Sequence, residues 1–215
     1  MNKSHLPTFS ITLIILFSGC LDESSDSGFW GTELSPPVPT PDFQLTNQYN
    51  DSVNLTTFKG NVLIVTFIFT HCTDTCLPIT YLLKNLSIML GSEFESNVSF
   101  LSISTDPERD TPEMLSIYTS QNNVSWSHLT GSRDSLKSVW DDFGVWVVPQ
   151  NSGSRHNDTH PDEDYNVIHN PVVFILDKDL RKRSLFTGVD WYPDYLLHDI
   201  EIILQEDWDP SVGYP

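Results

Sequence analysis

The feature that most constrains the fold is the uninterrupted apolar segment NVLIVTFIF, residues Asn61–Phe69. Strands that are buried on both faces of a sheet have such continuous β-branched sequences, whereas strands with one exposed face alternate polar and apolar residues. The segment PITYLLKNLSIML follows, and its leucines and isoleucines recur at helical spacing. A fully buried strand that leads into an amphipathic helix indicates the α/β class.

Strands and helices alternate along the rest of the chain. The further elements expected are a strand at Val98–Thr105, a helix capped by Thr111 with Pro112 as its first residue, a short strand ending at Gly131, a helix between Ser132 and Gly144, a hairpin of strands 171–177 and 181–188, and a helix at Pro193–Gln205. The polar segment 148–166 is expected to be a loop inserted before the hairpin. This order predicts an α/β fold with a central mixed β-sheet flanked by helices, and it resembles the thioredoxin-like arrangement.

The N-terminal residues indicate export. Lys3 precedes a short apolar run, Phe9–Phe17, which is too short to span a bilayer as a helix, and small residues follow up to Cys20. Residues 1–20 are therefore interpreted as a signal segment that resembles a lipoprotein signal, with Cys20 as the lipidated residue; the alternative is a plain N-terminal anchor in which Cys20 is incidental. Residues 21–41, rich in Ser, Asp and Pro, are expected to be a tether, 42–208 the folded domain and 209–215 a short tail.

The chain is strongly acidic, with 29 acidic and 11 basic residues and a formal net charge of −18. This charge excludes electrostatic binding to nucleic acid or to anionic lipid headgroups. It favours solubility, with docking to a basic partner protein as the alternative.

Cys72 and Cys76 lie where the buried strand ends and the next helix begins, a junction at the edge of an α/β sheet where ligands bind. If the segment is helical, both side chains share one face, and Cα atoms about 6 Å apart are also within disulfide range. Three interpretations follow: a structural Cys72–Cys76 disulfide, a redox-active dithiol and a soft-metal site. The usual dithiol motif has two intervening residues, whereas this chain has three.

His169 is the best candidate for a further ligand, because it directly precedes the apolar strand 171–177. In a thioredoxin-like sheet that strand neighbours the strand before the cysteines, so the preceding loop approaches the same edge. Two thiolates and one imidazole suit Cu(I), and imidazole also suits Cu(II). Zinc is less favoured, because a structural zinc site is usually four-coordinate. His71, beside Cys72, is the candidate for a fourth ligand, but its side chain is expected to point away.

Three motifs carry a family resemblance: FTHCTDTC, SISTDPERDTPEML and DYNVIHNPVVFILD. These motifs resemble those of the SCO/SenC family of copper-binding thioredoxin-like proteins and occur in the same order along the chain. The resemblance covers residues 43–205. It implies that Cys72, Cys76 and His169 bind copper as Cu(I) or Cu(II). It also implies a function in assembling the dinuclear copper centre of cytochrome c oxidase, as a metallochaperone or as a thiol reductase for that centre's cysteines. Asp74 occupies the family's usual aspartate inside the cysteine motif, where it is expected to influence the site.

The string DPERDTPE has a physical interpretation of its own. Asp106 is expected to lie where a strand ends at the edge of the sheet, either within a capped turn or as a support for the metal site. Arg109 is expected to pair with Asp110 or Glu108.

The cysteine motif departs from the family pattern, which commonly has a proline directly after each cysteine. Thr73 and Leu77 stand at those places here, and Pro78 comes one position late. Since proline restricts the backbone, the turn is expected to be more mobile, with an altered redox potential or copper affinity.

The principal functional hypothesis is an extracytoplasmic, membrane-anchored copper carrier. Its expected partners are a copper-receiving oxidase subunit or another copper carrier, a thiol reductant, and the membrane through the N-terminal anchor, with no nucleic acid. An enzymatic alternative is a thiol-disulfide reductase in which Cys72 and Cys76 are the catalytic pair, and peroxidase activity is more distant. A third is a scaffold lipoprotein that needs no reactive cysteine.

Overall fold

The computed structural model describes residues 28–72, 74–151 and 165–209. The expected signal segment with Cys20, most of the expected tether and residues 210–215 lie outside the described residues. The elements are β1 (Thr32–Pro39), β2 (Gln44–Asn47), β3 (Ser52–Asn54), η1 (Leu55–Phe58), β4 (Val62–Ile68), α1 (Cys76–Leu90), η2 (Gly91–Glu93), β5 (Val98–Ser104), α2 (Pro112–Asn122), β6 (Ser127–Thr130), α3 (Arg133–Phe143), β7 (Val147–Asn151), β8 (Tyr165–His169), β9 (Val172–Leu176), β10 (Arg181–Thr187) and α4 (Pro193–Gln205). None of the helices in these residues is long and apolar enough to cross a membrane.

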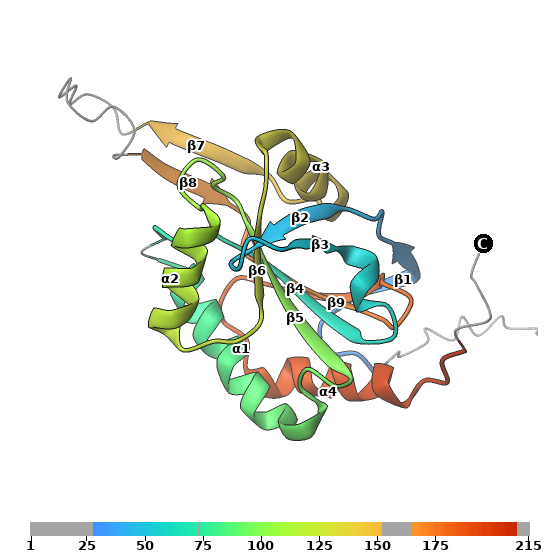
Figure 1. The fold of residues 1–215 in the computed structure, drawn as a ribbon. Helices are drawn as coiled ribbons and strands as arrows, with labels where there is room; N and C mark the ends of the chain where they lie inside the picture. The colour runs from blue at the N-terminus through green and yellow to red at the C-terminus, as the bar shows by residue number, and fades with distance from the viewer. Residues whose placement is uncertain (1–27, 73, 152–164, 210–215) are drawn as a thin grey trace, which may run out of the picture.

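Eight of the strands form one mixed sheet in the order β1-β10-β9-β4-β5-β6-β2-β3 (Figure 1). β4 lies inside this sheet, parallel to β5 on one side and antiparallel to β9 on the other. β5 and β6 are also parallel, whereas the outer pairs are antiparallel. The predicted fold class, a central mixed sheet flanked by helices, is confirmed.

The side chains of β4 alternate between two cores, which explains why its whole sequence is apolar. Leu63, Val65 and Phe67 face the core that α3 covers, while Val62 and Ile64 face the core that α1 and α4 cover. Figure 1 shows α1 and α4 together on one side of the sheet and α3 on the other. All seven residues of β4 are buried, so the position and direction of the chain that leaves β4 are well defined.

A third, smaller core lies at the carboxyl end of β4. It contains both cysteines, and its buried residues are Ile68, Phe69, Cys72, Cys76, Leu115, Tyr118 and Val167. These residues come from β4, from the turn into α1, from α2 and from β8. The cysteine turn is therefore packed between the sheet and the β7–β8 strand pair.

The helix ends follow the local chemistry of the sequence. The Thr111 hydroxyl accepts a hydrogen bond from the Met114 amide at the start of α2, and the Ser132 hydroxyl accepts one from the Ser135 amide at the start of α3. Gly144 ends α3 in the left-handed conformation that glycine tolerates best, with φ 66°. These three predictions are confirmed, as are the hairpin of β9 and β10 and the bounds of α4.

Two predicted boundaries are wrong. The expected tether 21–41 overlaps β1, which pairs antiparallel with β10 at the edge of the sheet. Edge positions accept proline, and the register shifts between Glu33 and Val38, around two of the prolines. The expected loop 148–166 contains β7 and the start of β8, which pair antiparallel as a separate two-stranded sheet.

Candidate metal centre

The turn between β4 and α1 is hydrogen-bonded to the buried carboxylate of Asp110. Asp110 is fully buried and accepts hydrogen bonds from the Thr70 amide (3.0 Å), the Thr70 hydroxyl (2.6 Å) and the Ser104 hydroxyl (2.6 Å). Burial raises the pKa of Asp110, and the bonds from Ser104 and Thr70 oppose that shift. Two residues after Thr70, the Cys72 amide donates to the Phe69 carbonyl and closes a tight turn.

Cys72 lies just outside α1, with its sulfur at the amino end of the helix. The Cys76 amide donates to the Cys72 sulfur at 3.3 Å, at a helix end where Thr75 makes no side-chain cap. The pKa of Cys72 is lowered to about 5, chiefly by the hydrogen bond with the Cys76 side chain; burial opposes this shift, and the amides of Asp74, Cys76 and Thr75 reinforce it. A thiolate is therefore favoured at neutral pH, stabilised by the unpaired amides of the first helical turn.

Cys76 is the first residue of α1 and is 1% exposed. Its pKa is raised, first by the hydrogen bond with Cys72, then by burial and by the nearby Cys72 charge. At neutral pH the Cys72 sulfur is therefore favoured as the thiolate, and the Cys76 sulfur keeps its proton. Neither cysteine is in a disulfide in the structure, so the Cys72–Cys76 disulfide remains a prediction for an oxidised form.

His169 ends β8 and lies at the same edge of the sheet as the cysteine turn. Its ring meets the Phe69 ring edge to face, with 6.1 Å between the centroids, and its Nδ1 is 3.2 Å from the Asn170 carbonyl oxygen. Burial lowers the pKa of His169, opposed by the bond to Asn170 and by the Cys72 charge. A neutral ring that donates from Nδ1 leaves the Nε2 lone pair for a metal.

The structure brings the three predicted ligands to one region without closing a metal site. Among the described residues, no group of three or more His, Cys, Asp or Glu side chains is arranged to hold a metal ion. Cys72 and Cys76 are in contact, and His169 is near enough to feel the Cys72 charge. Binding one ion with all three residues therefore requires the imidazole to approach the sulfurs.

The other predicted site residues have different surroundings. Asp74 is exposed, and its amide rather than its carboxylate stabilises the Cys72 sulfur. Asp106 is 1% exposed and lies in the turn after β5, as expected. His71 is exposed, and its Nδ1 is 3.0 Å from the Thr70 hydroxyl.

The expected pairing of Arg109 with Asp110 or Glu108 is wrong. Arg109 pairs with Asp106 instead, through Nε and Oδ2, while Glu108 pairs with Arg133. Asp110 is unavailable because Thr70 and Ser104 already surround it. The proximity of these charges was visible in the sequence, but the choice among them depends on contacts between distant segments.

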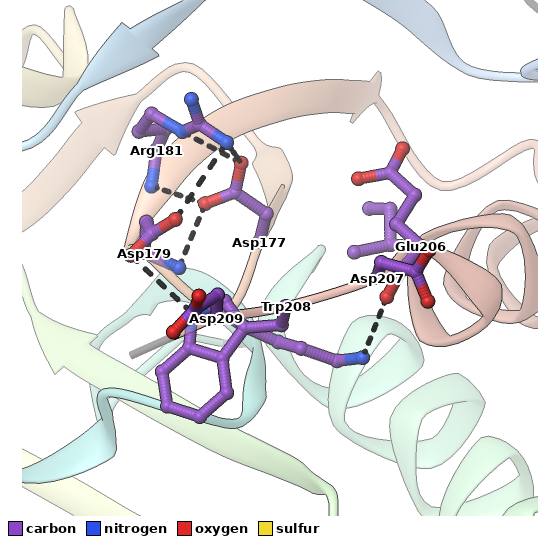
Figure 2. Close-up of a pocket in the computed structure, with 9 residues that line it drawn as sticks. Asp177, Asp179, Arg181, Glu206, Asp207, Trp208 and Asp209 are labelled. Atoms are coloured by element: carbon purple, nitrogen blue, oxygen red, sulfur yellow. Dashed lines mark hydrogen bonds and ion pairs between the residues drawn. The ribbon is translucent and has the colours of Figure 1, made fainter. Parts of the chain in front are cut away.

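The structure also has a cavity of about 160 Å³ far from the cysteines, at the end of the sheet where β4 begins. Its lining residues are Asp177, Lys178, Asp179, Arg181, Ile203, Glu206, Asp207, Trp208 and Asp209 (Figure 2). Arg181 pairs with Asp177, and the Lys178 ammonium donates to the Leu204 and Glu206 carbonyls. The Lys178 bonds join the end of α4 to the β9–β10 turn, and the Arg181–Asp177 pair lies within that hairpin, so both have a structural role.

The chain is similar to known proteins of one family. The SCO1/SenC family model matches residues 32–205. The chain is 28% identical to an SCO2-like protein of Rickettsia prowazekii, with 67% of each protein covered. It is 28% identical to the SCO1 protein homolog of Bacillus subtilis, with 80% of this chain and 86% of that protein covered. For other Rickettsia relatives the alignments span slightly under two thirds of the relative's length.

Solved structures agree with the sequence relatives. The copper-bound structure of Bradyrhizobium japonicum ScoI aligns with a TM-score of 0.67 and 25% identity, covering 77% of this chain and 99% of that one. The family model spans the whole folded domain, including β1, both cysteines and His169. This chain therefore belongs to the SCO1/SenC family.

Proposed function

We propose that this chain is an extracytoplasmic, membrane-tethered copper carrier that helps assemble the copper centre of cytochrome c oxidase. The observation that carries the proposal is the thiolate of Cys72, stabilised at the start of α1, beside Cys76 and at the same edge of the sheet as His169. Copper is the cargo in this proposal, and the copper-bound relative supports that choice.

The donor set fits a soft ion. Two sulfurs favour Cu(I), and an imidazole added to them also accommodates Cu(II), so the same three residues suit both oxidation states. Cys72 is 8% exposed and His169 8% exposed, which keeps the ligands shielded from bulk solvent but close to the surface. A site near the surface lets the thiols of a receiving protein replace the ligands one at a time.

The experiment is a Cu(I) competition titration of the reduced protein against a soluble chelator. Cys72→Ala, Cys76→Ala and His169→Ala are each expected to weaken Cu(I) binding by at least about 10-fold, because each removes one ligand. His71→Ala is the matched control, since this exposed histidine adjoins Cys72 and is expected to leave binding unchanged. Full copper loading in all three ligand variants would refute the site.

A thiol-disulfide reductase is the second candidate, favoured by the unequal pKa values of the two cysteines. The Cys72 thiolate would attack a partner disulfide and release one partner thiolate, forming a mixed disulfide. Cys76, after losing its proton, would attack the Cys72 sulfur, release the second partner thiol and leave a Cys72–Cys76 disulfide. An external thiol reductant must then restore the pair.

The two functions separate in one assay. Metal-free wild-type protein and His169→Ala are compared for reduction of a model disulfide in the presence of excess thiol reductant. Equal, rapid turnover by both proteins would favour the reductase, because thiol exchange does not need the imidazole. Slow turnover together with tight Cu(I) binding would favour the carrier.

The membrane anchor is proposed from the sequence of residues 1–20, with Cys20 as the lipid attachment point. In a bacterial host, Cys20→Ser is expected to move the protein from the membrane fraction to the soluble extracytoplasmic fraction. Absence of a lipid on Cys20 of the membrane-bound wild-type protein, by mass spectrometry, would refute lipidation and leave the apolar run as the anchor.

A further inference from the structure

The strand that carries His169 does not belong to the main sheet. β8 pairs only with β7, and in the described part of the chain this pair shares no strand pairing with the eight-stranded sheet (Figure 1). At its His169 end, β8 continues within three residues into β9, which is paired with β4. At this end the Asn170 side chain also accepts from the Trp146 amide, and β8 is held at its opposite end through Tyr165.

Three contacts hold Tyr165 against the turn that follows β5. The Tyr165 hydroxyl donates to Oδ1 of Asp106, and Nη1 of Arg109 donates to the Tyr165 carbonyl at 3.0 Å. The Arg109 guanidinium also lies 3.9 Å from the centroid of the Tyr165 ring. A cation is attracted to the face of an aromatic ring, and here this attraction adds to the two hydrogen bonds that Tyr165 makes.

Asp106 and Arg109 are themselves well anchored. The Asp106 carboxylate is 1% exposed and pairs with Nε of Arg109, and the Asp106 amide donates to the Ser104 hydroxyl. The Arg109 guanidinium lies 5.9 Å from the centroid of Phe69, the same ring that meets His169. One guanidinium thus contacts both the start of β8 and the aromatic residue behind the imidazole.

We propose that Asp106, Arg109 and Tyr165 form a clamp that positions His169 for metal binding. Tyr165, Val167 and His169 alternate along β8 and therefore share one face of the strand. Val167 on that face packs in the same core as both cysteines. Holding Tyr165 limits the rotation of this face and keeps the imidazole on the side of the core that contains both cysteines. This inference rests on the proposed role of His169 as a copper ligand.

The clamp is tested first without metal. Arg109→Lys keeps the positive charge but loses the planar fork that contacts Asp106 and Tyr165 together. Arg133→Lys is the matched control, because Arg133 pairs with Glu108 of the same turn at the surface. By amide hydrogen–deuterium exchange with mass spectrometry, Val167–His169 is expected to exchange several-fold faster in Arg109→Lys and at the wild-type rate in Arg133→Lys. Unchanged exchange in Arg109→Lys would overturn the clamp.

The second measurement asks whether the clamp acts through His169. Residues that orient metal ligands commonly change affinity by about 10–100-fold, so Arg109→Lys is expected to weaken Cu(I) binding within that range. In a His169→Ala background, adding Arg109→Lys is expected to cause no further loss, because the residue being positioned is gone. An equal loss in both backgrounds would indicate general damage and would overturn the positioning role.

A milder variant and a spectroscopic signal complete the test. Tyr165→Phe removes only the hydroxyl bond to Asp106 and is expected to give a smaller effect in the same direction. In Cu(II)-loaded protein, the nitrogen hyperfine signal of His169 in the EPR spectrum is expected to broaden in Arg109→Lys and not in Arg133→Lys. If wild-type protein binds no copper, the proposed function fails, while the exchange measurement still decides whether the clamp exists.

Discussion

The ionisation of Cys72 gives the most direct test of how the site works. The bond with the Cys76 side chain is the largest cause of the lowered Cys72 pKa, and main-chain amides provide the rest of the stabilisation. Cys76→Ala removes the side-chain donor and keeps the amides. Cys76→Ser replaces the thiol with a hydroxyl that can still donate to the Cys72 sulfur.

The size of the effect follows from the strength of that bond. A hydrogen bond to a charged group contributes about 1.5–3 kcal/mol, and each pKa unit corresponds to about 1.4 kcal/mol. From a starting value of about 5, the pKa of Cys72 is expected to rise by roughly 1–2 units in Cys76→Ala. In Cys76→Ser it is expected to stay within about half a unit of the wild-type value, because a donor remains.

The assay is the rate of alkylation of Cys72 as a function of pH, measured by peptide mass spectrometry so that Cys72 is resolved from Cys76 and Cys20. The midpoint of the rate profile reports the pKa, since the thiolate is the reactive form. A wild-type midpoint near that of an ordinary thiol would refute the reasoning. So would equal midpoints in the Ala and Ser variants, because the side-chain donor would then be irrelevant.

Three further predictions follow from the same contacts. Cu(I) binding at pH 7 is expected to release about one proton, from Cys76, measurable by calorimetry in buffers of different ionisation enthalpy. Burial lowers the pKa of His128 from 6.5 to about 4, so the unfolded chain binds the extra proton below pH 6.5. The free energy of unfolding of the wild type, taken relative to that of His128→Gln, is therefore expected to fall by roughly 3 kcal/mol between pH 6.5 and 4. Urea unfolding of both proteins at each pH measures it. Asp110→Ala leaves the Thr70 and Ser104 donors without their buried acceptor and is expected to cost roughly 3 kcal/mol in the same unfolding assay at pH 7.

Much of the fold could be predicted from local pattern and capping chemistry. The apolar run before the cysteines is continuous because β4 has a core on each face. Thr111 and Ser132 mark helix starts because their hydroxyls accept a nearby backbone amide, and Gly144 marks a helix end because glycine tolerates the left-handed conformation. Such signals depend on neighbours in the sequence and are therefore readable from it.

The elements that were missed depend on distant partners. The composition of β1 argues against a strand, and its pairing with β10 joins segments about 150 residues apart in the chain. The choice of Asp106 by Arg109 likewise depends on Tyr165, which lies 56 residues away from Arg109. No short window of sequence contains both β1 and β10, or both Arg109 and Tyr165.

The candidate site was predicted in outline and not in detail. The sequence placed both cysteines at the junction of strand and helix, as the structure does, but it left open whether Cys72 is helical; its sulfur lies at the helix start and accepts the Cys76 amide. That geometry depends on Asp110, whose bonds to Thr70 shape the turn from another segment of the chain. The family resemblance supplied the function that geometry alone left open.

The separation of the β7–β8 pair from the main sheet has a consequence for how such proteins diverge. Two of the proposed copper ligands, Cys72 and Cys76, lie in a buried core, and the third, His169, is on a strand pair that is paired only with itself in the described residues. Because this pair shares no strand pairing with the eight-stranded sheet in the described residues, substitutions in β7 and β8 leave the hydrogen-bonded ladders of that sheet intact. Related chains can thus differ at the strand pair that carries the proposed ligand His169 while the sheet that carries the cysteine turn stays unchanged.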